Sequence, residues 1–430
     1  MKKLTFLLFL GLSISAFGQV NVENLKTHLE YLASDAMMGR ETGSREAFEC
    51  ANYIASQFKA LGLQAPEIAP DYMQEFTLVN SENAIRNLTL NNLEIDPDDF
   101  VVLSSAKSLR ISDPVKIQFV FIGEQDDFMQ KFSELDGLDE SFMVLIDPIH
   151  KNRFTRLRNY LSRPRYNLGS KNNKFSVWVM SNAKTIETLD LYALNKIDEI
   201  KGYNVIGVLP AADSSTGYIW MYSAHYDHIG IQQPINGDSI ANGANDDASG
   251  VAAILELARI FTEEKTSDKS LWFVAFSAEE MGLFGSESLV KLMETEPIEG
   301  MVNIEMIGLA NVDLGSASAF ISGYELSLWP DKMAQSVPQD EFMFFPDPYP
   351  DLQLFMRSDN ASFAKFGIAA HSISTYSESD QTYHQVNDEI DHIEFGNMKT
   401  VINAIYQGSI PLLQNNYDPG KINYQIKSDR

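Results

Sequence analysis

The fold is decided at Leu271-Trp272-Phe273-Val274-Ala275-Phe276-Ser277-Ala278-Glu279-Glu280, where an apolar run ends in a pair of carboxylates. An apolar run of this length is typical of a strand that is buried on both faces, as in a parallel sheet. Two adjacent carboxylates at its end would be costly unless solvent or a cation met them. Because ligands gather at the carboxyl ends of parallel strands, this stretch predicts a metal site at that edge of the sheet.

The half of the chain that follows Gly202 alternates between strand-like and helix-like segments. Strands are predicted at 218–222, 271–276, 302–307 and 368–375, and helices at 249–261, 286–293, 360–366 and near the end, around 395–405. Such alternation is typical of α/β proteins. The predicted fold class is therefore α/β, with a mixed, largely parallel central sheet flanked by helices.

Side chains of the types that bind metals lie at separate strand or loop ends in this half: His225, Asp246, Glu280, Glu305 and His384. Two imidazoles and three carboxylates suit zinc, which accepts nitrogen and oxygen donors. Two metal ions bridged by one carboxylate would use the whole set, although the residues alone show only that the donors suffice.

Taken singly, these motifs have ordinary alternatives. His225 and His228 could be a pair of surface histidines. Asp246 and Asp247 precede a helix that starts at about Ser249, and aspartate is a common helix cap. We expect Asp246 to bind metal and Asp247 to cap the helix or support the turn. For Glu305 and His384 the alternative is a position outside any metal site.

Glu279 is predicted to be a general base. Adjacent residues at a strand exit point in different directions, so Glu280 can bind a metal while Glu279 faces a water molecule. A metal lowers the pKa of bound water to about 7, and a nearby carboxylate can then accept the proton. The alternative is a solvated loop, which the strongly apolar preceding strand disfavours.

The composition limits the partners and the location of the chain. Its formal charge of −26 would repel nucleic acid and anionic membranes. Residues 1–18 have a basic start, an apolar stretch and a small-residue cleavage site near Gly18, which indicates a signal peptide and a periplasmic or secreted protein without a membrane anchor. The single cysteine, Cys50, excludes an internal disulfide and fits the core of a helix.

The region 80–201 differs from the rest of the chain in its pattern of apolar and charged residues. Short apolar runs at 115–122, 142–146 and 175–180 alternate with charged loops, which predicts a β-rich insert. The insert has no cluster of residues with ligand spacing, so a binding or lid role fits it better than chemistry. The catalytic domain is expected to consist of residues 19–79 and 202–430.

Several motifs, taken in order, carry a resemblance to a known family: 31–35, Gly39-Arg40, Gly43-Ser44, 58–63, 204–207, 223–228, 242–250, Glu279-Glu280, 303–308, Ser358-Asp359 and Tyr383-His384. The chain resembles the secreted bacterial di-zinc aminopeptidases. These are co-catalytic zinc exopeptidases, whose relatives include glutamate carboxypeptidases, glutaminyl cyclases and the transferrin-receptor ectodomain. The resemblance covers nearly all of the chain after the signal peptide.

The resemblance implies a role for each matching residue. It implies two zinc ions, with His225 and Glu280 on different metals, Asp246 between them and His384 as the last ligand. Glu279 corresponds to the general base, Asp227 to the carboxylate that orients the first histidine, and Tyr383 to a tyrosine that stabilises the oxyanion. Glu305 stands where many relatives carry aspartate. The insert is similar, more loosely, to a protease-associated domain.

The resemblance leaves several functions open. An aminopeptidase acting on peptides or dipeptides is favoured, because the acidic site would attract the free amine of the substrate. A carboxypeptidase or dipeptidase would need a cation for the substrate carboxylate, and Arg357 is a candidate. A glutaminyl cyclase works with a single zinc and would not need all five ligands. A binding ectodomain without catalysis would have lost ligands.

Overall fold

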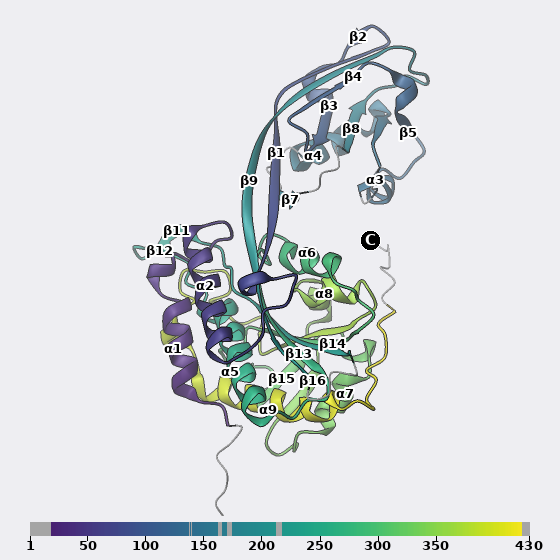
Figure 1. Ribbon diagram of the computed structural model, residues 1–430. Coiled ribbons are helices and arrows are strands. Elements are labelled where there is room, and N and C mark those ends of the chain that lie inside the picture. Colours follow the sequence, from purple (N-terminus) through teal and green to yellow (C-terminus); the bar gives the residue numbers. More distant parts are fainter. Residues whose placement is uncertain are drawn as a thin grey trace, which may run out of the picture. The chain divides into compact units, whose positions relative to one another are not determined.

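The computed structural model describes residues 19–136, 138, 140–161, 166–169, 174–211 and 217–423 (Figure 1). The chain forms two compact units, of which the first contains the chain up to Glu75 and from Tyr203 on, and the second is Phe76–Gly202. The expected signal peptide, residues 1–18, lies outside the described residues. The second unit covers the region where the sequence predicts an insert, at 80–201.

The first unit is built on a mixed sheet with the strand order β16-β15-β17-β14-β10-β13-β9. Its strands are β9 (Leu189–Leu209), β10 (Ile219–His225), β13 (Ser270–Phe276), β14 (Ile298–Glu305), β15 (Ser318–Ile321), β16 (Met343–Pro346) and β17 (Ala369–Ser374). The neighbours of β10 and β14 are all parallel, whereas β9 and β15 pair antiparallel with β13 and β17. The carboxyl ends of β10, β13, β14 and β17 therefore lie along one edge of the sheet.

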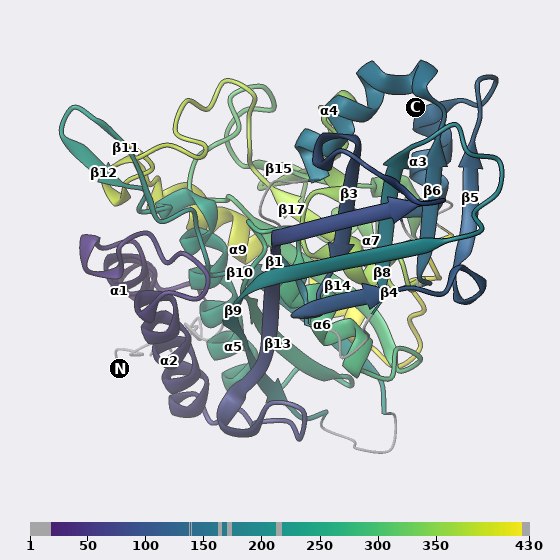
Figure 2. The same ribbon diagram turned by 90° about the horizontal axis from the view of Figure 1, so that it is seen from above.

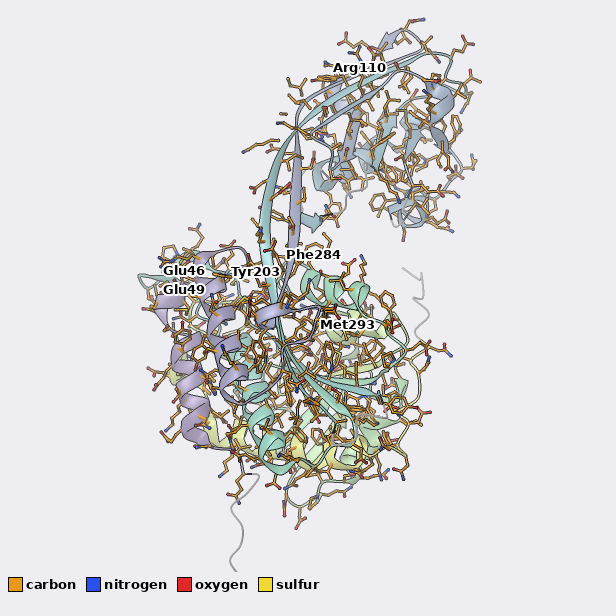
Figure 3. The ribbon with its side chains drawn as sticks, viewed as in Figure 1. Glu46, Glu49, Arg110, Tyr203, Phe284 and Met293 are labelled. Atoms are coloured by element: carbon orange, nitrogen blue, oxygen red, sulfur yellow. The ribbon has the colours of Figure 1, made fainter. Side chains whose placement is uncertain are left out.

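Helices cover both faces of this sheet (Figure 1). They are α1 (Val22–Leu32), α2 (Arg45–Ala60), α5 (Ser249–Glu264), α6 (Phe284–Leu292), α7 (Trp329–Gln335), α8 (Asn360–Ala364) and α9 (Phe395–Ser409). Figure 2 shows α1 and α2 side by side, as does Figure 1. Figure 3 labels Phe284, the first residue of α6, and Met293, which follows its last residue. A separate small hairpin consists of β11 (Ile231–Ile235) and β12 (Asp238–Ile240).

The period-two pattern of the central strands divides the core into two layers. In β10, Tyr222 packs into the cluster that contains Leu25, Ile254 and Ile402 from α1, α5 and α9. The preceding residue of the strand, Met221, packs into the cluster that contains Leu289 of α6 and Phe363 of α8. Because successive side chains of a strand point to opposite faces, apolar runs such as 271–276 can be buried on both sides.

The predicted fold class is confirmed, since the sheet is mixed, largely parallel and flanked by helices. The strand predicted at 271–276 is β13, and the helix predicted at 249–261 is α5, which extends to Glu264. The strand predicted at 302–307 lies earlier, since β14 ends at Glu305. Beyond that residue the chain turns, with a φ of 50° at Met306.

The second unit has its own sheet, with the order β3-β8-β6-β5. This sheet consists of β3 (Phe100–Ser104), β5 (Gln118–Ile122), β6 (Phe142–Ile146) and β8 (Phe175–Met180). Outside it, β2 (Leu93–Glu94) and β7 (Tyr166–Leu168) pair with β1 (Met73–Leu90), and β4 (Ser108–Ile111) pairs with β9. Arg110, labelled in Figure 3, lies in β4. The unit also contains the helices α3 (Phe128–Asp136) and α4 (Lys151–Leu161), so it is less purely β than its short apolar runs suggest.

Two further features concern burial and membranes. Cys50 is buried in α2, as its helical spacing predicts. Among the described residues, no helix combines the length and the apolar character that crossing a membrane requires.

Candidate metal centre

The five predicted metal ligands come together at the carboxyl edge of the parallel strands. His225 is the last residue of β10 and Glu305 the last residue of β14. Glu280 follows β13, and His384 lies in the segment between β17 and α9. Asp246 lies in the turn Ala244–Ala248, directly before α5. Each ligand thus comes from a different connection of the sheet.

The carboxylate of Asp246 faces two groups of donors, one with each oxygen. Its Oδ1 atom lies 3.2 Å from Nε2 of His225, and that nitrogen lies 3.2 Å from Oε1 of Glu305. Its Oδ2 atom lies 3.3 Å from Nε2 of His384, which lies 3.0 Å from Oε2 of Glu280. Two atoms bound to one zinc ion at about 2.0–2.1 Å lie about 3.3 Å apart in a tetrahedral site. Both groups therefore have the spacing of zinc ligands.

The charges of the centre also call for a cation. Asp246, Glu279, Glu280 and Glu305 gather here with side chains at most 17% exposed. Oδ2 of Asp246 is buried and has no hydrogen-bond partner among the described residues. Buried carboxylates are costly unless they are paired or bind a metal. The donor set of imidazoles and carboxylates fits zinc.

His225 is oriented by the residue two positions on. Its Nδ1 atom lies 3.1 Å from the backbone carbonyl of Asp227, which can accept the N–H, and 3.7 Å from Oδ1 of the same residue. This leaves Nε2 free to face Asp246 and Glu305. Burial lowers the pKa of His225, but the carboxylates of Glu305 and Glu279 outweigh it and raise this pKa well above its usual value.

The carboxylate of Asp227 holds the Glu279-Glu280 turn. It accepts hydrogen bonds from the backbone N–H groups of Glu279 (3.2 Å) and Glu280 (3.4 Å). It also accepts a hydrogen bond from the hydroxyl of Thr42 (2.9 Å). The backbone of Asp227 thus orients His225, while its side chain places both glutamates.

Glu279, the predicted general base, lies beside the first group of donors. Its Oε2 atom lies 4.0 Å from Nε2 of His225, and its side chain is 11% exposed. Burial raises the pKa of Glu279 well above its usual value, and the nearby carboxylates of Glu305 and Asp359 act in the same direction. A carboxylate whose pKa is raised is a stronger base than an ordinary carboxylate, which suits a group that accepts a proton and later returns it.

The backbone adopts left-handed conformations at three non-glycine residues beside the ligands. These are Ala278 (φ 58°), Met306 (φ 50°) and His384 (φ 56°). Such conformations are uncommon outside glycine and are often found at functional sites. They change the direction of the chain just after β13 and β14 end and at His384 itself.

Two aspartates beside Asp246 support the turn that carries it. Asp247, for which a capping or supporting role is predicted, accepts hydrogen bonds from the N–H groups of Gly250 and Met306 (both 3.0 Å) and of His225 (3.2 Å). It therefore ties the helix start to β10 and β14. Asp388 accepts hydrogen bonds from the N–H groups of Asn245 (2.8 Å) and Asp246 (2.9 Å). Sequence reasoning did not single out Asp388.

Arg40 is a second supporting residue whose contacts the sequence does not reveal. Its guanidinium is fully buried and donates to the backbone carbonyls of Tyr226 (2.7 Å) and Gly243 (3.0 Å). It also donates to the carbonyls of Leu32 and Asn242. Arg40 thus connects the segment after β10 to the turn before Asp246. In the sequence, only its place in the Gly39-Arg40 motif indicated that Arg40 has a role near the site.

His228 lies within the second group of donors, although the sequence suggested a surface position as one alternative. It is buried, and its Nδ1 atom lies 2.9 Å from Oε1 of Glu280. Its position three residues after His225 was the only signal. His228 can therefore contact a residue of the metal centre directly.

A cavity of about 420 Å³ opens onto the centre. Four of the five candidate ligands, all but His225, line it together with Glu279. Its walls also include Phe320, Leu354, Met356 and Arg357. Tyr383 also lines it, and the ring of this residue stacks on His384 with 4.0 Å between the ring centroids. Burial raises the pKa of Tyr383, so its hydroxyl remains a hydrogen-bond donor at neutral pH. The cavity combines apolar walls with a few polar groups, as ligand sites usually do.

Comparisons with known proteins show what this chain is similar to. Residues 204–408, just under half of the chain, match the family model described as Peptidase family M28. A probable zinc metalloprotease of Pyricularia oryzae is 36% identical over 111 residues, which are 25% of this chain and 22% of that protein. The chain thus matches about a quarter of the length of the first such relatives.

A longer match and a structural match concern aminopeptidases. Leucine aminopeptidase 1 of Leptosphaeria maculans is 25% identical over 289 residues, covering 62% of this chain and 72% of that protein. The structure of a zinc aminopeptidase from Bacillus subtilis superposes with a TM-score of 0.56 at 17% identity, covering 94% of this chain and 98% of that one. This structural likeness concerns the fold.

Proposed function

Because residues 204–408 match the model of peptidase family M28, we propose that this protein is a zinc-dependent aminopeptidase that hydrolyses the first peptide bond of its substrates. The observation that carries the proposal is the carboxylate of Asp246, which faces a histidine and a glutamate with each of its two oxygens. The relative named leucine aminopeptidase 1 supports the choice of reaction.

The proposal includes two zinc ions. His225 and Glu305 would hold one, Glu280 and His384 would hold the other, and Asp246 would bind both. When bound, zinc acts as a Lewis acid and lowers the pKa of water. The spacing of 3.0–3.3 Å between the donor atoms supports this assignment.

The residues around the metal ligands would carry the proton transfers. Glu279 accepts a proton from the attacking water and later gives it to the leaving amine. Its low exposure and its distance of 4.0 Å from His225 support this role. Asp227 keeps Glu279 in place through the backbone N–H. Tyr383, whose hydroxyl stays protonated, can donate a hydrogen bond to the developing oxyanion.

The cavity supports recognition of a free N-terminal residue. Its buried carboxylates would attract an ammonium group, and the walls at Phe320, Leu354 and Met356 would contact an apolar side chain. A volume of about 420 Å³ is within the range of small-ligand sites.

A second candidate is a carboxypeptidase or dipeptidase, and one observation favours it. Arg357 lines the cavity, and its guanidinium has no hydrogen bond or ion pair within the described part of the chain. A guanidinium binds a carboxylate with two parallel hydrogen bonds. Arg357 could therefore bind the C-terminal carboxylate of a short substrate.

A panel of substrates separates these functions. We expect the purified protein to hydrolyse aminoacyl amides with a free amine and to leave their N-acetyl forms intact. If free-carboxylate dipeptides are strongly preferred over aminoacyl amides, and Arg357→Gln abolishes the preference, the dipeptidase is the better assignment. Formation of pyroglutamate from N-terminal glutamine would identify a glutaminyl cyclase, and no turnover at all would favour a binding ectodomain.

Metal content tests the zinc pair directly. Protein purified without chelator should contain close to two zinc ions per chain by elemental analysis. Exhaustive dialysis against a chelator should remove both ions and the activity together, and zinc should restore the activity. A content of one ion, or of none, would count against the pair.

Two further assignments concern the rest of the chain. The sequence of residues 1–18 supports export to the periplasm or the medium, which fractionation of cells expressing the chain with and without these residues would test. We assign the unit Phe76–Gly202 as a protease-associated-like domain with a role in binding, because none of the candidate ligands lies in it. Deletion of this unit should then change KM more than kcat.

A further inference from the structure

His228 is a fully buried histidine beside the candidate metal centre, with a side chain that is 0% exposed. Its Nδ1 atom lies 2.9 Å from Oε1 of Glu280 and 4.0 Å from Oδ2 of Asp246. A Cβ atom on Gly243 would lie 2.6 Å from Cδ2 of the His228 ring. Gly243 also has a φ of 58°, which favours glycine. The missing side chain at Gly243 therefore leaves room for the imidazole.

The second ring nitrogen of His228 decides between a metal ligand and a hydrogen-bond donor. Nε2 is buried and has no hydrogen-bond partner among the described residues. A neutral imidazole carries one N–H. If Nδ1 bound a metal, the proton would be on Nε2, as a buried donor without an acceptor, which is costly. If Nδ1 carries the proton, it donates to Glu280 and no donor is left unpaired.

The distances agree with the second arrangement. Nε2 of His384 lies 3.3 Å from Oδ2 of Asp246, close to the separation of about 3.3 Å between two ligands of one zinc ion. Nδ1 of His228 is 4.0 Å from the same oxygen, and its distance of 2.9 Å to Glu280 is that of an ordinary hydrogen bond. His384 therefore has the position of a ligand, and His228 has the position of a donor to a ligand.

We infer that His228 is a positioning residue, which donates a hydrogen bond from Nδ1 to Oε1 of Glu280 and so directs Oε2 of Glu280 toward the zinc ion shared with Asp246 and His384. The inference rests on the zinc pair of the proposed function. It concerns one of the two ions, since Glu280 is the candidate ligand within hydrogen-bond distance of the His228 ring among the described residues.

The neighbour of His228 holds the same glutamate by its backbone. The carboxylate of Asp227 accepts the N–H of Glu280 at 3.4 Å, while His228 holds the side chain. The end of β10 thus supplies His225 to one zinc ion, and the two residues Asp227 and His228 after it fix Glu280 for the other. Loss of the hydrogen bond from His228 should therefore lower the affinity for the zinc ion that Glu280 binds, and it should leave the ion bound by His225 unaffected.

A matched pair of variants tests the inference. His228→Asn keeps an amide N–H close to the position of Nδ1, whereas His228→Leu has a similar size and no donor. We expect the leucine variant to release one zinc ion at a chelator concentration about 10–100-fold lower than wild type, as is usual when a partner of a metal ligand is lost. The asparagine variant should remain within a few-fold of wild type. Far-UV circular dichroism with excess zinc checks that both variants fold.

X-ray absorption of the zinc-loaded wild type gives a second measurement that needs no variant. Two imidazole ligands over two ions, one per zinc on average, are expected. An average of one and a half would identify His228 as a ligand and overturn the inference. Two bound ions with wild-type chelator resistance in His228→Leu would also overturn it, leaving the proposed function intact. Fewer than two ions in the wild type would overturn both.

Discussion

The carboxylate of Asp388 accepts the backbone N–H of Asp246 at 2.9 Å, so the segment that carries His384 also fixes the residue that faces both groups of donors. A second hydrogen bond joins Asp388 to the N–H of Asn245 at 2.8 Å. Both contacts are buried. The position of Asp246 therefore depends on a residue that binds no metal itself.

Replacing Asp388 with alanine should damage both stability and metal binding. Two buried N–H groups would lose their acceptor, at a cost of about 1–3 kcal/mol each in the free energy of unfolding. Zinc should also be released at a lower chelator concentration, because Asp246 would be less well placed. Urea unfolding and chelator titration measure the two effects. The control is Asp391→Ala, an exposed position in the same segment; equal effects of the two substitutions would contradict the role of Asp388.

Glu279→Gln should abolish turnover without loss of zinc. The amide has a similar size but cannot accept the proton, so kcat should fall on the order of 10²–10⁴-fold. Steady-state kinetics and elemental analysis on the same sample check both statements. Glu296→Gln, at a strongly exposed residue, should behave as wild type. A Glu279→Gln variant that keeps more than about a tenth of the wild-type rate would show that another group is the base.

The glutamate side chain of Glu305 is long enough for its two oxygens to contact different residues. Its Oε2 atom accepts a hydrogen bond from the hydroxyl of Ser358 at 2.7 Å, while Oε1 lies 3.2 Å from Nε2 of His225. Glu305→Asp should move the carboxylate back by about the length of one methylene group and lower the affinity for one of the two zinc ions. Glu305→Ala should lower this affinity further. Graded chelator challenge with zinc analysis measures this. Unchanged stoichiometry in both variants would remove Glu305 from the set of ligands.

His371 should lower the stability of the protein as the pH falls from about 6.5 toward about 4. Burial lowers the pKa of His371 to about 4, and its Nδ1 and Nε2 atoms are engaged by the carbonyl of Ser322 (2.9 Å) and the hydroxyl of Ser327 (2.7 Å). Below the unfolded pKa of 6.5 the unfolded chain binds a proton that the folded chain does not, so unfolding is favoured.

Urea unfolding at a series of pH values tests this dependence. His371→Asn should be less stable at pH 7 but show a shallower loss of stability on acidification than wild type. The same substitution at the exposed His392 should leave the slope unchanged. An identical slope in wild type and His371→Asn would mean that other groups cause the acid sensitivity.

The sequence was sufficient for the fold class and for the convergence of the donors. A strand such as β13 is predictable because its six apolar residues need burial on both faces, and the residues after it must then lie at the sheet edge. The same reasoning applies to His225 and Glu305, which end neighbouring parallel strands. Local patterns therefore determine where the ligand side chains start.

The supporting contacts could not be predicted in the same way. Asp388 and Asp246 are 142 positions apart, and nothing in the local pattern of either indicates a hydrogen bond between them. The carboxylate of Asp227, which was expected to orient His225, lies 3.7 Å from its Nδ1 atom. It also accepts the backbone N–H of Glu279, and the peptide carbonyl of Asp227 lies nearer to the ring at 3.1 Å; neither of these two contacts could be predicted. These contacts depend on the packing of separate loops.

The two N-terminal helices are synthesised well before the helices against which they pack. α1 and α2 end by Ala60, yet they pack on α5, which begins at Ser249, and α1 also packs on α9 near the end of the chain. At about 5–20 residues per second, a ribosome needs about 10–40 s to make the intervening chain of roughly 190 residues. For that time Leu25, Leu29 and Ile54 have no core to enter. During this interval a chaperone can bind the exposed apolar residues, or the chain can be translocated while it is still unfolded.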